Sequence, residues 1–255
     1  MVSEGIFVYL NETEREAVIG HETGHIANND FIVMTMAAFL VSVMFQLSRI
    51  FLRSKSGGGK KGGGYLFIIG IVAYVFYLIG TYMLLFLSRT REYLADEFSA
   101  RETGKPDELA SALVKIAFGL IQAAETDKSS SLAEATRTLG IYDHKAAKSF
   151  GLASVVDMNA EKSNAVEGAI RYDLHSLWGR WAELHSSHPL TGKRIARLES
   201  EPGAKQWYGS AAIAKQSVDT SRLWTEFIRD GFITYISIIV GLIGLVSGIL
   251  LAQNV

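Results

Sequence analysis

The chain has 255 residues, a length that allows one domain with additional elements. Its net charge of −1 at pH 7 excludes the strongly basic surface that is typical of nucleic-acid-binding proteins, so no nucleic-acid partner is expected. It contains no cysteine, which excludes disulfide bonds and cysteine-ligated zinc.

A helix is predicted in residues 1–30. Thr13 and Glu16 match the capping box that marks a helix start, and short polar side chains at residues 28–30 favour a helix end there. Residues 21–25 read His-Glu-Thr-Gly-His, an HExxH motif. Positions four apart share one helix face, so His21 and His25 can bind one Zn²⁺. An amphipathic helix with two surface histidines is the alternative.

Glu22 gives this motif a chemical meaning. Zinc lowers the pKa of a bound water to about 7, and a carboxylate one position beyond the first histidine can accept the proton of that water. The spacing therefore predicts a metalloprotease-type centre with Glu22 as general base.

Three uncharged, apolar stretches are predicted to cross the lipid bilayer: residues 31–47, 65–88 and 231–255. The first is short, because a helix of this length spans about 26 Å, so a buried core helix is the alternative there. A glycine-rich loop over residues 49–64 joins the first two. Residues 31–88 are therefore predicted to form a transmembrane helical hairpin.

A helical hairpin returns the chain to the face from which it left. The residues after position 88 should therefore emerge near the HExxH helix, where a third metal ligand is needed. Glu92 and Asp96 lie four apart, so one can bind the metal while the other holds a ligand histidine. Arg89 and Arg91 are predicted to be interfacial anchors of the second span.

Three motifs in this order resemble the HtpX family of membrane zinc metalloproteases, gluzincins related to the CAAX prenyl endopeptidases. They are HExxH at residues 21–25, Arg-Glu-Tyr-x-Ala-Asp at residues 91–96, and Ser-His-Pro-Leu followed by Arg-Ile at residues 187–195. The resemblance covers roughly residues 2–198. Family members usually carry two further membrane helices before HExxH, and the sequence leaves open whether these are missing or naturally absent here.

The resemblance implies a role for each matching residue. His21, His25 and Glu92 would bind one zinc ion, with Glu22 as general base. Asp96 would be the carboxylate behind a ligand histidine. His188 and Arg194 would lie near the cleft, with His188 helping to stabilise an oxyanion.

The expected fold is mainly α: a gluzincin-type helical core with about three transmembrane helices and little β structure. The remainder of the protease domain is placed at residues 89–204, with a packing helix at 106–125 and no readable chemistry in 126–171. An amphipathic connector at 205–230 leads to a C-terminal transmembrane helix at 231–255. Gly244 and Gly248 permit close helix contact there, so packing on the hairpin and homo-oligomer formation are alternatives.

These features predict an integral membrane zinc endopeptidase that acts on protein or peptide substrates. The resemblance implies membrane protein quality control. The alternatives are a prenyl-protein processing peptidase with the same chemistry and a non-catalytic membrane adaptor with a structural metal site. Glu22 argues against the adaptor, because a structural site needs no base. Basic residues flank both ends of the hairpin, so charge does not decide orientation; the resemblance implies a cytosolic metal site.

Overall fold

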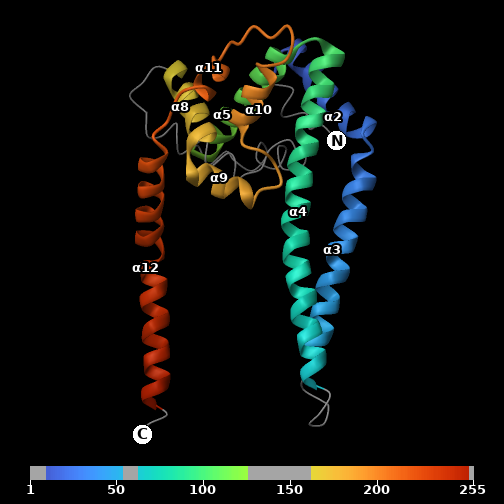
Figure 1. Ribbon diagram of the computed structural model, residues 1–255. Helices are drawn as coiled ribbons and strands as arrows, with labels where there is room; N and C mark the ends of the chain where they lie inside the picture. The colour runs from blue at the N-terminus through green and yellow to red at the C-terminus, as the bar shows by residue number, and fades with distance from the viewer. Residues whose placement is uncertain (1–9, 54–62, 126–161, 253–255) are drawn as a thin grey trace.

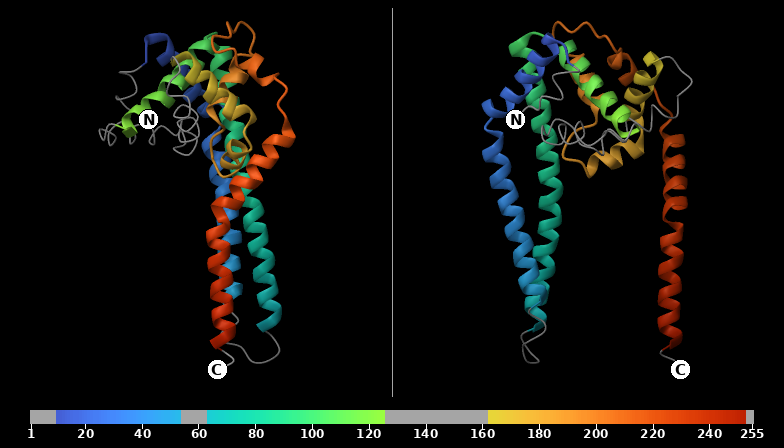
Figure 2. Two further views of the ribbon diagram at one scale, coloured as in Figure 1. Left: turned by 90° about the vertical axis from the view of Figure 1, so that its left-hand side faces the viewer. Right: turned by 180° about the vertical axis from the view of Figure 1, so that it is seen from behind.

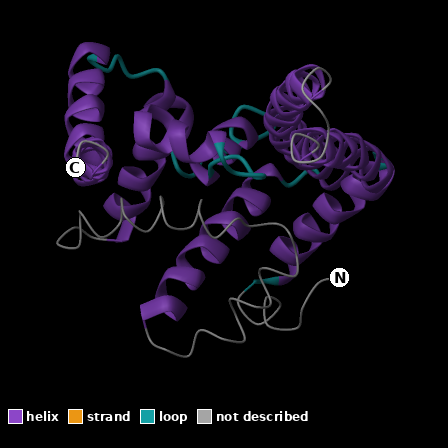
Figure 3. Ribbon diagram, turned by 90° about the horizontal axis from the view of Figure 1, so that it is seen from below, coloured by secondary structure: helices purple, strands orange, loops and turns teal. Residues whose placement is uncertain are grey.

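The computed structural model describes residues 10–53, 63–125 and 162–252. Every regular element in this part is a helix (Figure 3), which confirms the mainly α expectation. A body of shorter helices lies at one end of three long ones, α3, α4 and α12 (Figure 1). The helices are α2 Glu12–Ala27, α3 Asp30–Arg53, α4 Gly63–Thr103, α5 Pro106–Glu125, α8 Lys162–His175, α9 Leu177–Leu184, α10 Thr191–Leu198, α11 Ser210–Ala214 and α12 Thr220–Ala252.

Helices α3 and α4 form the predicted hairpin and lie side by side in all views (Figure 2). Both are long and apolar enough to cross a membrane, and only 6% of each apolar window is buried. Large apolar side chains such as Phe31, Phe39 and Met83 are more than 60% exposed. A core helix of a soluble protein would bury this surface, so the arrangement favours contact with lipid over the alternative of a buried first helix.

The ends of the hairpin differ from the prediction. Helix α3 continues to Arg53, so the predicted loop start at residue 49 is wrong. Helix α4 begins at Gly63, inside the glycine-rich stretch, and residues 54–62 lie outside the described residues. The third predicted span falls on α12, a helix of 33 residues. Most side chains of its apolar half are not described, so that span stays a prediction.

The start of α2 also differs from the prediction. Asn11, not Thr13, caps the helix: its side chain accepts a hydrogen bond from the Glu14 backbone, and Glu14 accepts one from the Asn11 backbone in return. Glu14 is buried and also accepts hydrogen bonds from Ser111 and Lys115 of α5. The capping box therefore fixes α2 to its neighbour as well as starting the helix.

One apolar core joins α2, α5, α8, α10 and α11. The predicted packing helix at 106–125 is confirmed as α5, which supplies more of the described core side chains than any other helix. Helix α8 begins inside the stretch 126–171, in which no chemistry was read, and its Ala169 and Ile170 are fully buried. Residues 126–161 lie outside the described part of the chain. The leucines and isoleucines of the core are Leu10, Leu109, Leu113, Ile116, Ile170, Ile195, Leu198 and Ile213.

Two glycines let α2 approach α4 closely. A Cβ atom at Gly24 would lie 3.0 Å from the Cα of Ala95 and 3.2 Å from its carbonyl oxygen. One turn earlier, a Cβ at Gly20 would lie 2.8 Å from the Ser99 hydroxyl, which donates a hydrogen bond to the Ala17 carbonyl. Because backbone atoms meet at Gly24, no side-chain movement can make room for a larger residue there.

We expect Gly24→Ala to destabilise the protein, although alanine is normally the better helix former. Overpacking against the α4 backbone should cost about 1–3 kcal/mol, more than the roughly 1 kcal/mol that helix propensity returns. The thermal unfolding midpoint of the detergent-solubilised chain measures the balance. Gly231→Ala is the matched control, since nothing lies within 4 Å of a Cβ there. Equal or higher stability of Gly24→Ala would contradict the close approach.

We expect Glu14→Gln to lower stability by about 2 kcal/mol at pH 7, because an amide cannot replace the charged acceptor of Lys115. Burial alone would raise the pKa of Glu14, but its hydrogen bonds to Lys115 and Ser111 outweigh this and lower it from 4.5. The unfolded chain therefore takes up the proton first on acidification. The stability difference between the two proteins should be constant above about pH 5 and shrink as pH falls further. Thermal unfolding from pH 7 to pH 3 tests this; a difference as large at pH 3 as at pH 7 would contradict it.

Candidate metal centre

Helix α2 presents both histidines of the HExxH motif toward α4. His21 is 1% exposed and His25 is partly buried. Their rings meet edge to face with centroids 4.8 Å apart, and their Nε2 atoms lie 3.2 Å apart. The predicted shared face of the helix thus brings two imidazole nitrogens together.

Glu92 of α4 completes a group of three ligands. Its Oε2 lies 3.7 Å from Nε2 of His21, and its Oε1 lies 3.6 Å from Nε2 of His25. Ligands held about 2.05 Å from a tetrahedral ion lie about 3.3 Å from one another, so these separations are close to those of a metal-bound set. Two histidines and one glutamate form a ligand set of catalytic zinc sites, which leave a fourth position open.

A carboxylate stands behind each histidine. Nδ1 of His21 lies 2.9 Å from Asp96, as the four-residue spacing of Glu92 and Asp96 predicted. Nδ1 of His25 lies 2.6 Å from Oδ2 of Asp30, the first residue of α3. A proton held on Nδ1 by a carboxylate leaves Nε2 with a free lone pair, which is the form that binds metal. The donor chemistry therefore fits a divalent ion at this point.

Arginines in turn hold the carboxylates. Arg194 of α10 donates two hydrogen bonds to Asp96, at 2.8 and 2.7 Å, and its Nη1 lies 3.3 Å from Glu92. Burial acts to raise the pKa of Glu92, but the close contact with His188 and the charge of Arg194 outweigh it and lower that pKa. At Asp96, burial again acts to raise the pKa. The charge of Arg194 is the strongest of the effects that lower it, and the net result is a lowered pKa. Both carboxylates are thus kept ionised, as a metal site requires.

Glu22 has one oxygen in an unusual position. Its Oε1 is buried, and no hydrogen-bond partner for it lies among the described residues. A buried carboxylate oxygen without a partner is costly, so such a group points to a role in binding or catalysis. Because Glu22 follows His21 directly, this oxygen is a candidate acceptor for a proton at the open ligand position.

His188 and Arg194 reach the site from the C-terminal side. Nδ1 of His188 lies 3.3 Å from Oε1 of Glu92, and its side chain is 16% exposed. The guanidinium of Arg194, expected near the cleft, is only 2% exposed and lies behind Glu92 and Asp96. The loop before His188 is held by Arg89, which donates hydrogen bonds to the Glu183 and Ser186 carbonyls.

Sequence reasoning missed three residues of this environment. The sequence predicts Asp30 only as part of a helix end, although a carboxylate five residues beyond His25 was the available signal. The prediction that Arg89 and Arg91 anchor the span at the membrane surface stays a prediction. In the structure Arg89 also donates to backbone carbonyls, and Arg91 Nε lies 2.8 Å from Asp30. Their proximity to Glu92 in sequence was the only hint.

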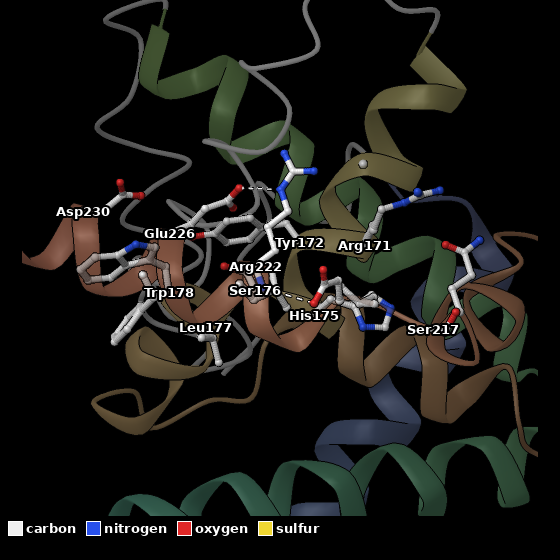
Figure 4. A pocket seen from close by; sticks show the side chains of 16 residues that line it. Arg171, Tyr172, His175, Ser176, Leu177, Trp178, Ser217, Arg222, Glu226 and Asp230 are labelled. Atoms are coloured by element: carbon white, nitrogen blue, oxygen red, sulfur yellow. Dashed lines mark hydrogen bonds and ion pairs between the residues drawn. The ribbon is translucent and has the colours of Figure 1, made fainter.

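A cavity of about 720 Å³ lies elsewhere, between α8, α9 and the first turns of α12 (Figure 4). None of the metal-site residues lines it. Two arginines that line it form ion pairs with glutamates four residues away on the same helix. Arg222 pairs with Glu226, and Arg171 pairs with Glu167. The rings of Trp178 and Phe227 meet at a tilt of 52° with centroids 4.6 Å apart, which joins α9 to α12 beside the cavity.

Comparison with known proteins agrees with this geometry. The model of Peptidase family M48 matches residues 1–202. Protease HtpX homolog 2 of Methanosarcina acetivorans is 36% identical over 78% of this chain and 57% of its own length. Protease HtpX homolog of Kineococcus radiotolerans is 30% identical over 80% of this chain and 60% of its own.

The chain spans about half the length of the curated relatives that it matches. No solved structure shows significant similarity to it. The family match covers the HExxH helix, the hairpin, Glu92 and His188 together. The chain is a member of Peptidase family M48.

Proposed function

We propose that the protein is an integral membrane zinc endopeptidase that hydrolyses peptide bonds. The observation that carries this proposal is the convergence of His21, His25 and Glu92 beside the unpartnered oxygen of Glu22. Three ligands with a free base are what hydrolysis requires, whereas a structural site has no use for the base. Membership of a peptidase family and relatives named as proteases support the same conclusion.

Zinc, when bound, supplies a Lewis acid that polarises the scissile carbonyl and the attacking water. Glu22 then removes a proton from that water and later delivers it to the leaving amine. Asp96 and Asp30 hold His21 and His25 in the tautomer that leaves Nε2 free.

His188 and Arg194 assist in different ways. His188 lies beside Glu92 and is partly exposed, so its ring can donate a hydrogen bond to the oxyanion that forms on the substrate. Arg194 is too deeply buried to meet substrate, and we assign it to holding Glu92 and Asp96 in place. Both assignments rest on the contacts that these side chains make with Glu92.

The position of the centre supports substrates that lie close to a membrane. His25 precedes the first apolar residue of α3 by six positions, and Glu92 follows the apolar part of α4 by about one turn. We therefore propose a multi-pass protein whose metal site lies at the surface of the bilayer, and the resemblance to the HtpX family favours its cytosolic face. The proposed substrates are membrane proteins that have a cleavable segment close to the bilayer surface and that are degraded in quality control.

We expect Glu22→Gln to reduce casein cleavage by at least about 100-fold, because a neutral amide cannot accept the proton of water. Its zinc content should equal that of the unaltered chain, since the three ligands remain. Glu12→Gln, an exposed change in the first turn of the same helix, is the matched control. Activity and zinc content are measured on the same samples. Full activity of Glu22→Gln would exclude Glu22 as the base, and zinc without cleavage in the unaltered chain would favour a non-catalytic adaptor.

We expect His188→Ala to lower kcat about 100-fold with a much smaller change in KM, because an oxyanion donor acts in the transition state. Steady-state cleavage of a fluorogenic peptide separates the two constants. His185→Ala, a change at an exposed histidine three residues earlier, should leave both nearly unchanged. An effect of His188→Ala on KM alone would instead assign the ring to substrate binding.

A further inference from the structure

The two ligand histidines are supported by different parts of the molecule. His21 is held by Asp96 of α4, which Arg194 of α10 holds in turn. These three groups are at most 3% exposed, so this support lies wholly inside the helical body. His25, in contrast, has its carboxylate partner in the first residue of membrane helix α3.

The support of His25 contains a second ion pair. Asp30 uses Oδ2 for Nδ1 of His25 at 2.6 Å and Oδ1 for Nε of Arg91 at 2.8 Å. The Asp30 side chain is 5% exposed and that of Arg91 is 14% exposed. Each carboxylate oxygen thus has its own partner, which fixes the rotation of the carboxylate as well as its position.

The chain path makes this contact specific. Helix α2 ends at Ala27, and Asn29 adopts a left-handed conformation with φ of 53° before α3 begins at Asp30. This bend between the two helices places Asp30 against the ring of His25. Arg91 comes from α4, one position before the ligand Glu92, and so closes the junction between the two helices of the hairpin.

We infer that Asp30 and Arg91 are a positioning pair for His25: Arg91 fixes the Asp30 carboxylate, and Asp30 holds the His25 ring with Nε2 directed at the metal. The inference rests on the proposed function, because it requires a metal at this centre. It assigns to the entry of the membrane hairpin a supporting role in metal binding. Neither residue touches the metal or the substrate, so both act through His25.

Zinc affinity of the full chain in detergent tests the inference. Competition with a chromogenic chelator at constant pH gives the dissociation constant without any need for activity. We expect Asp30→Asn to weaken zinc binding 10- to 100-fold, the usual loss when a carboxylate behind a ligand histidine is removed. Arg91→Gln should weaken it by a smaller factor, roughly 3- to 10-fold, because Asp30 remains in place.

The double variant is the decisive measurement. If Arg91 acts through Asp30, adding Arg91→Gln to Asp30→Asn should change the zinc dissociation constant by less than about twofold. The matched controls are Glu97→Gln and Arg197→Gln, an exposed ion pair at 3.4 Å that also involves α4. Both controls should bind zinc as the unaltered chain does.

The other possible outcomes contradict either this inference or the proposed function. Unchanged zinc affinity in both Asp30→Asn and Arg91→Gln, or independent effects of the two changes, would overturn the inference while the proposed function stands. Equal losses in the Glu97 and Arg197 controls would overturn it too, since any nearby charge would then suffice. An unaltered chain that binds no zinc would overturn the proposed function itself. If Asp30→Asn fails to fold, judged by helicity and thermal unfolding, Arg91→Gln alone decides the case, and unchanged affinity overturns the inference.

Discussion

The close approach of α2 and α4 is the constraint on which the centre depends. Gly24 allows the α2 backbone to meet the α4 backbone at Ala95, and Gly20 faces Ser99 one turn earlier. Glu92 and Asp96 lie on either side of Ala95 in sequence. The contact that brings the helices together therefore also sets the distance between the histidines and the carboxylates. A side chain at Gly24 would push α2 away from α4 and so increase the distance between the histidines and Glu92, which must be short for both to bind one metal ion.

Charge is the second constraint, because the centre is largely buried. Glu22, Glu92, Asp96 and Asp30 carry four formal negative charges, and Arg194 and Arg91 carry two positive ones. With neutral histidines, the excess of two negative charges equals the charge of one divalent ion. Buried carboxylates are costly when unpaired, so a bound divalent ion would satisfy the group together with the arginines. The arginines are placed behind the carboxylates, which leaves the ligand atoms facing the histidines.

The parts of this site that the sequence predicted are those joined by helical spacing. His21 with His25 and Glu92 with Asp96 are four-residue pairs, and the hairpin between them predicted their proximity. Asp30 escaped prediction because it follows a turn at Asn29 and shares no helix with His25. Arg194 was identified through its motif alone, and its contact with Asp96 across 98 residues could not be derived from local pattern. The capping box was misplaced because Thr13 with Glu16 and Asn11 with Glu14 both fit the pattern, and only packing against Ser111 and Lys115 decides between them.

Helix α4 has one further property that matters beyond the centre itself. It runs without a break for 41 residues, about 60 Å, so one rigid rod carries both the apolar crossing and the two carboxylates. Transmembrane helices adjust their tilt to bilayer thickness. Glu92 lies about 6 Å beyond the apolar part of α4, so a tilt change of about 10° about the bilayer edge would move it by roughly 1 Å. Misplacement on that scale is enough to alter a reaction rate about 100-fold. In the proposed membrane peptidase, the acyl-chain length of the surrounding lipids would therefore act on the chemistry through the stiffness of a single helix.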